Sequence, residues 1–243
     1  MANDQHILSA FDRDLETIQA LIMKMGGLVE AAILDGAKAL EDLDEELAEK
    51  VRGQDKVIDE LEERINTEAA RLIALRSPAA TDLRTVLTVM KISGNLERIG
   101  DYAKNMGKRV PVLIDAVPVD GSKSALRRMA KDVEAMLKDV LDAYIQRDAE
   151  KAEDVRQRDH EVDQMYNALF RELLTHMLED PRQITACMHL HFIAKNVERM
   201  GDHVTSIAEQ VIYLVRGALP EESRPKGDMT STHLIPDAGE HKE

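Results

Sequence analysis

Aromatic residues are scarce in this sequence, which has no tryptophan and an aromatic share of only 3%. The hydrophobic share is nevertheless 44% over 243 residues, so aliphatic side chains are numerous enough to build a buried core. Alanine, leucine, methionine, glutamate, aspartate and lysine dominate, and this composition favours packed helices. We therefore expect an all-α protein and regard a sheet-rich fold as excluded.

Cysteine and long apolar runs are equally scarce. Cys187 is the single cysteine, so the chain has no internal disulfide and no Cys-x-x-Cys pair, and we predict a buried thiol. The start, Met1–Asp14, has no basic or apolar signal region, and no run of about eighteen apolar residues follows. These features predict a cytoplasmic protein.

Positive charge is also in deficit, because the formal net charge is −14. Nucleic-acid binding needs clustered lysine and arginine, so this balance excludes a nucleic-acid partner and favours cations or basic protein surfaces. The sequence contains no Gly-rich phosphate loop, no Gly-x-Ser-x-Gly and no His-Glu-x-x-His. We expect a protein that is not an enzyme.

Seven prolines fall at a few places and mark helix boundaries. Between them apolar residues recur at helical spacing, with an N-cap candidate around Asp42–Asp44. The pattern predicts six long helices, at about 7–40, 47–75, 80–109, 126–144, 148–179 and 181–215.

An internal repeat organises these helices. Asn95–Asp101, with the sequence Asn-Leu-Glu-Arg-Ile-Gly-Asp, recurs as Asn-Val-Glu-Arg-Met-Gly-Asp at Asn196–Asp202. We predict two tandem three-helix bundles. Their boundaries are 1–110 for the first bundle, 111–121 for a linker, 122–217 for the second bundle and 218–243 for a disordered tail.

Each repeat carries paired acids at helical spacing. Glu97 and Asp101 lie one turn apart, as do Glu198 and Asp202, so each pair projects from one helix face at the bundle edge. If the preceding helix turns its own acids toward them, each bundle gathers four carboxylates, the oxygen ligands that hard cations prefer. The additional acids are Asp55 and Asp59 in the first repeat and Asp159 and Asp163 in the second.

A structural interpretation stands beside this metal hypothesis. The acids would then form a solvated rim that pairs with the neighbouring arginines, which are Arg52, Arg98, Arg156 and Arg199. His189 and His191 are two residues apart and should point to different sides of their helix. Gly100 and Gly201 interrupt the helices beside the acids, which predicts close helix approach.

The two motifs closely resemble the PhoU family of phosphate-uptake regulators. The resemblance is carried by Asn95–Asn105, by Ile193–His203 and by Ile207–Glu209, and extends over roughly residues 7 to 216. It implies two three-helix bundles that usually form a homodimer in the cytoplasm. It also implies metal sites, because some members bind multinuclear iron or other metals through such acids, with Zn²⁺, Mn²⁺, Mg²⁺ and Ca²⁺ as further candidates.

The function implied by this resemblance is negative regulation of phosphate uptake and of the phosphate-starvation (Pho regulon) response. The expected partners are the ATPase subunit of the phosphate ABC transporter and a phosphate-sensing histidine kinase, and the regulator would reach the membrane only through them. An alternative function is a ferritin-like di-metal carboxylate oxidase or iron store, against which the absence of any Glu-x-x-His counts. A coiled-coil scaffold without metal is the third possibility.

Overall fold

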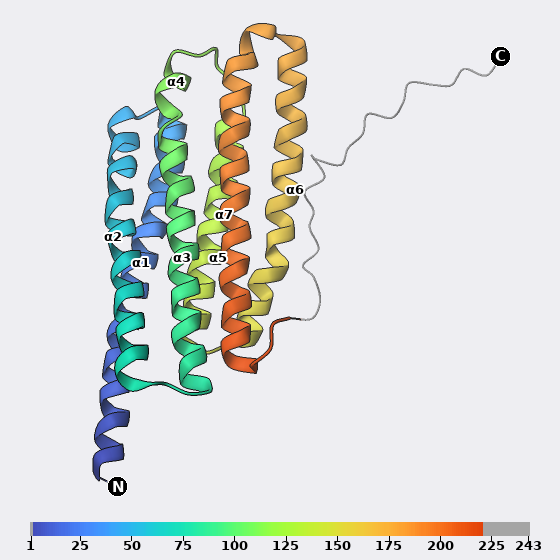
Figure 1. Cartoon of the computed structure of the whole chain (residues 1–243). Helices are drawn as coiled ribbons and strands as arrows, with labels where there is room; N and C mark the ends of the chain where they lie inside the picture. The colour runs from blue at the N-terminus through green and yellow to red at the C-terminus, as the bar shows by residue number, and fades with distance from the viewer. Residues whose placement is uncertain (1, 221–243) are drawn as a thin grey trace, which may run out of the picture.

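The computed structural model describes the backbone of residues 2–220 and the side chains of residues 11–220. All regular structure in this part of the chain is helical, as the composition predicts. The six long helices are α1 (Ala2–Asp42), α2 (Glu45–Arg76), α3 (Thr81–Gly107), α5 (Ser122–Gln146), α6 (Ala149–Glu179) and α7 (Ile184–Arg216) (Figure 1). Residues 221–243, most of the predicted disordered tail, lie outside the described residues.

Equivalent caps begin the second helix of each repeat. The Asp44 side chain accepts a hydrogen bond from the Leu47 backbone N–H at 2.9 Å, and Asp148 accepts from the N–H groups of Glu150 and Lys151 at 3.0 Å. Each carboxylate satisfies donors that have no partner inside the helix. The N-cap prediction around Asp42–Asp44 is confirmed.

The two bundles lie side by side and share a long interface. Helices α1, α2 and α3 form the first bundle, and α5, α6 and α7 the second. Helix α1 packs on α5, while α3 packs antiparallel on α7, with α2 and α6 at the outer edges (Figure 1). Aliphatic side chains fill the core, and Cys187 is fully buried among them, as predicted.

The predicted linker is partly helical. Its first residues belong to the short helix α4 (Val110–Ile114), which contacts α2 and α7 and buries Val110 and Leu113. A second short element, the 3₁₀-helix η1 (Pro181–Gln183), joins α6 to α7 and is capped by Asp180. The connection between the bundles therefore packs on the core.

Within the described part of the chain, one helix is long and apolar enough, by length and composition alone, to cross a membrane. It is the Phe11–Asp42 part of α1, whose most apolar window has a mean hydropathy of 1.4 and is 44% buried. Core helices of soluble proteins meet the same criterion. Because α1 packs on α2, α3 and α5, we assign it to the core.

Candidate functional site

The first acidic cluster, defined as Asp55, Asp59, Glu97 and Asp101, forms between α2 and α3. Partial desolvation raises the pKa of Asp59, although its side chain remains exposed, and the neighbouring Asp55 carboxylate raises it further. Burial likewise raises the pKa of Glu97, with Asp101 as the next cause. These shifts are expected where carboxylates crowd together at a partly desolvated site. Helix α2 therefore turns its acids toward α3, which is the condition that the metal hypothesis set for this repeat.

Close helix approach brings these acids together. A Cβ atom at Gly100 would lie 3.0 Å from Ile58 Cδ1 on α2, and one at Gly201 would lie 2.8 Å from Asp159 Oδ1 on α6. Both contacts are tighter than ordinary van der Waals packing. The glycines therefore let each motif helix approach its neighbour beside the acids, as the sequence predicts.

Lys104, on α3, supplies the cation that bridges the two helices in the first acidic cluster. Its Nζ donates a hydrogen bond to Asp55 Oδ2 on α2 and another, 3.0 Å long, to Asp101 Oδ1 on α3. The bond to Asp55 is the main cause that raises the pKa of Lys104. Sequence reasoning missed this residue, although its position one turn after Asp101 places it on the same helix face.

The second acidic cluster, defined as Asp159, Asp163, Glu198 and Asp202, lies between α6 and α7. Its first three members are 2%, 2% and 5% exposed, so Glu198 lies deeper than the bundle-edge position predicted for it. The reason is the packing of α6 on α7, which places the Asp159 carboxylate directly over Gly201.

One lysine contacts the second acidic cluster, and a buried arginine lies one turn before Asp159 on α6. Lys195 Nζ lies 2.9 Å from Glu198 Oε2, and Arg156, itself buried, bonds to Glu153 at 2.9 Å. Arg156 Nε also lies 3.6 Å from Glu209 Oε1 on α7. Sequence reasoning missed Lys195, whose position one turn before Glu198 was the available signal.

The predicted rim of arginine partners is only partly correct. Arg98 does lie near the motif, at 3.6 Å from Glu97 and 3.8 Å from Asp101. Arg52 instead pairs with Glu49, one turn earlier on its own helix. Arg156 likewise bonds to an acid outside the motif. Each of these two arginines thus bonds to a glutamate three residues before it on its own helix.

The carboxylates have the chemistry that hard cations prefer, but their arrangement does not fit a metal ion. Among the described residues, no three His, Cys, Asp or Glu side chains converge closely enough to hold one. In the first acidic cluster the Lys104 ammonium lies between Asp55 and Asp101. Metal binding by the eight acids stays a prediction from the sequence.

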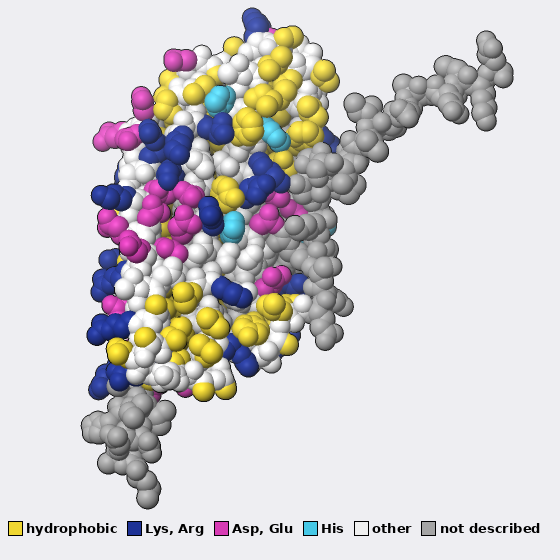
Figure 2. Space-filling view, in the orientation of Figure 1, with side chains coloured by type: hydrophobic (Ala, Val, Ile, Leu, Met, Phe, Trp, Pro, Cys, Tyr) yellow, Lys and Arg dark blue, Asp and Glu magenta, His cyan; other side chains and the backbone are white. Residues whose placement is uncertain are grey.

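The motif helices also meet each other. His203 Nδ1 on α7 shares a 2.9 Å hydrogen bond with Asn95 Oδ1 on α3, and the His203 and Tyr102 rings lie 5.7 Å apart. Burial lowers the pKa of His203, and two nearby arginines, Arg98 and Arg199, lower it further. Figure 2 shows the result, a charged band across this face with hydrophobic patches on either side.

The other predicted histidines do not converge on a ligand. His189 Nδ1 lies 3.4 Å from Arg109 Nη1, whereas the His191 ring lies 5.2 Å from Phe170 and 6.0 Å from Tyr166. The two side chains thus point to different surroundings, as their spacing predicts. They have structural roles in the packing of α7.

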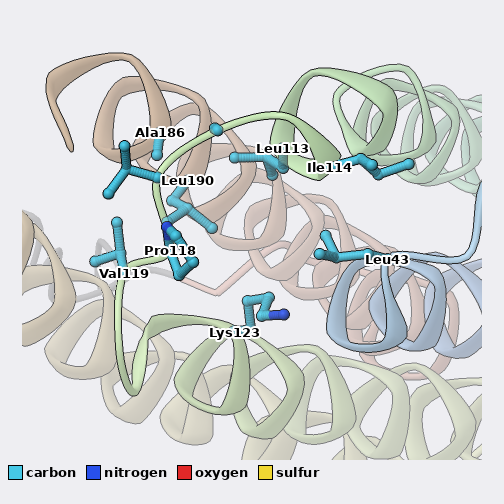
Figure 3. Close-up of a pocket in the computed structure, with 10 residues that line it drawn as sticks. Leu43, Leu113, Ile114, Pro118, Val119, Lys123, Ala186 and Leu190 are labelled. Carbon is cyan, nitrogen blue, oxygen red and sulfur yellow. The ribbon is translucent and has the colours of Figure 1, made fainter. Parts of the chain in front are cut away.

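A small apolar pocket lies beneath the predicted linker, at the start of α7. Figure 3 shows Leu113, Pro118 and Val119 facing Ala186 and Leu190 around a cavity of about 90 Å³. Of the residues that line it, only Lys123 is charged, and its ammonium donates to the Glu41 carbonyl at 3.1 Å. This lining offers no pair of titratable groups for acid–base chemistry.

The fold and the site together define a duplicated helical-bundle protein with a paired acidic motif in each repeat. The family model described as PhoU domain matches residues 22–110 and again residues 126–211. The chain belongs to the PhoU family.

Individual relatives agree with this assignment. The chain is 46% identical over 227 residues to a phosphate-specific transport system accessory protein PhoU homolog from Rhizobium meliloti, with 93% of this chain and 96% of that protein covered. It also resembles the crystal structure of PhoU from Pseudomonas aeruginosa, with a TM-score of 0.82, 40% identity and coverage of 86% of this chain and all of that one. For the phosphate transport system regulatory protein PhoU from Streptococcus pneumoniae the TM-score is 0.81 and the identity 31%, with 87% of this chain and 100% of that chain covered.

Proposed function

We propose that this chain is a non-enzymatic regulator that restrains phosphate uptake and the phosphate-starvation response when phosphate is plentiful. The observation that carries the proposal is 46% identity, over 93% of the chain, to a protein named as an accessory of phosphate-specific transport. A match along both bundles supports a shared role more strongly than a shared fold does. The proposed site of action is the cytoplasm.

The proposed mode of action is protein contact, with the transporter ATPase subunit and a phosphate-sensing histidine kinase as partners. The face built by α3 and α7 supports this mode because exposed apolar side chains flank its charged band (Figure 2). Phe192 on α7 is 44% exposed, with the Arg109 guanidinium 4.5 Å from its ring centroid. Exposed aromatic and arginine side chains are enriched at protein interfaces. The active form is proposed to be a homodimer.

A deletion strain tests the regulatory role. The strain carries a phosphate-starvation alkaline phosphatase reporter and grows in excess phosphate. We expect high reporter activity that a plasmid copy of the wild-type chain returns to the repressed level. Normal repression in the deletion strain would contradict the proposal.

Affinity capture tests the contact face. The tagged chain should recover a transporter ATPase and a sensor kinase from cells grown in high phosphate. Phe192→Glu should weaken this recovery, whereas Ile145→Glu on α5, at a site 49% exposed, should leave it unchanged. Circular dichroism verifies that both variants fold. Equal recovery with both variants would exclude Phe192 from the interface.

The ferritin-like alternative gains no support from the described residues. An oxidase or iron store of that type places Glu-x-x-His motifs inside its bundle, and the sequence contains none.

A further inference from the structure

The two acidic clusters differ at one aligned position. When Asn95–Asp101 is aligned with Asn196–Asp202, Lys104 on α3 corresponds to Thr205 on α7. The Lys104 ammonium reaches across to α2, whereas the Thr205 hydroxyl donates to the Asp202 carbonyl of its own helix at 2.8 Å. Only the first repeat therefore has a lysine at this position within its acidic cluster.

The contacts of Asp55 show why a cation is held here. Its side chain is 8% exposed, and a buried carboxylate is costly unless a charge or a donor accompanies it. Oδ2 accepts the Lys104 hydrogen bond, while Oδ1 is buried with no hydrogen-bond partner. One Asp55 oxygen is therefore bonded to the ammonium, and the other has an unused lone pair that could accept a further contact.

Lys104 also spans the helix pair that would bind a metal. It contacts Asp55 from α2 and Asp101 from α3 at the same time. A divalent cation placed between these two carboxylates would have to displace the ammonium and would otherwise face a like charge. Two cations cannot occupy this position together.

We infer that Lys104 is the resident cation of the first acidic cluster and closes that cluster to divalent metals. The acids of the first repeat then serve as an internal ion-pair network that ties α2 to α3. Any metal response of this chain must therefore arise elsewhere, and the two repeats are unequal despite their shared motif.

Counting bound Mn²⁺ tests this inference. The untagged full-length chain is stripped with chelator, saturated with Mn²⁺, desalted and analysed for metal. We expect Lys104→Thr to bind one more ion per chain than the wild type, because without the ammonium the carboxylates that now bond to it are free to close on Mn²⁺. Lys104→Met, which keeps most of the aliphatic stem, should gain the same ion if the threonine variant folds poorly.

Asp55→Asn identifies the location of that ion. In the Lys104→Thr background it should abolish the extra ion and the extra Mn²⁺-dependent rise in Tm. In the wild-type background it should leave the Mn²⁺ count unchanged. The inference would be overturned if the Asp55→Asn single variant bound fewer Mn²⁺ ions than the wild type. It would also be overturned if neither Lys104 variant gained an ion.

Discussion

The two acidic clusters carry the same motif, but their surroundings differ. In the first, Asp59 is exposed, Glu97 is half-buried and a lysine bridges the helices. In the second, Asp159, Asp163 and Glu198 are almost fully buried. Duplication thus preserved the helix pairing while the counter-ions and the burial of the acids diverged. The motif alone does not define the chemistry of either site.

Substitution of the aligned arginines, Arg52 and Arg156, should show the largest difference in stability between the two repeats. Arg156 is buried, with its side chain 7% exposed, whereas Arg52 is 42% exposed. Arg156→Ala should cost about 1 to 3 kcal/mol of unfolding free energy, because it removes a buried side chain that is ion-paired with Glu153 and Glu209. Arg52→Ala should change it by less than about 0.5 kcal/mol. Urea unfolding measures both, and equal losses would contradict the difference in burial.

Alanine substitution of the motif glycines, Gly100 and Gly201, should show a smaller difference in stability between the two repeats. Gly201→Ala places a Cβ atom 2.8 Å from the buried Asp159 carboxylate, and we expect a loss of about 1 to 3 kcal/mol from the forced shift. Gly100→Ala meets the movable tip of Ile58 at 3.0 Å. There the helix propensity of alanine, about 1 kcal/mol better than glycine, offsets the crowding. Thermal denaturation of the pair tests this ranking, which equal Tm changes would refute.

The motif glutamates should respond to substitution with opposite signs. The pKa of Glu97 is raised in the folded state, so the native protein binds its proton more tightly than the unfolded chain does. Stability from this group therefore falls as pH rises through the raised pKa. Glu97→Gln should stabilise at pH 7 by less than about 1 kcal/mol, and this gain should vanish in acid.

Glu198→Gln is the matched comparison. It removes the charge that lies 2.9 Å from Lys195 at a buried position, so it should destabilise the protein at pH 7. Urea unfolding across pH follows both variants. Stabilisation by both substitutions would show that the two clusters are electrostatically alike.

Much of the fold could be predicted because its causes are local. Proline positions, the Asp44 cap and the apolar periodicity define helices from residues close in sequence. The sequence left open whether α2 turns its acids toward α3, and the contacts of Lys104 with Asp55 and Asp101 show that it does. The role of Lys104 could not be predicted, since a lysine one turn from an aspartate also fits a solvated helix face.

By itself the sequence determined the helical class, the duplication, the family and the position of the acids on their helices, because each depends on spacing along the chain. Only the tertiary structure decided that Lys104 bridges α2 and α3 and that Asp159, Asp163 and Glu198 are buried. Those properties depend on how closely separate helices pack. Packing distance sets both the desolvation of a carboxylate and the cation that reaches it.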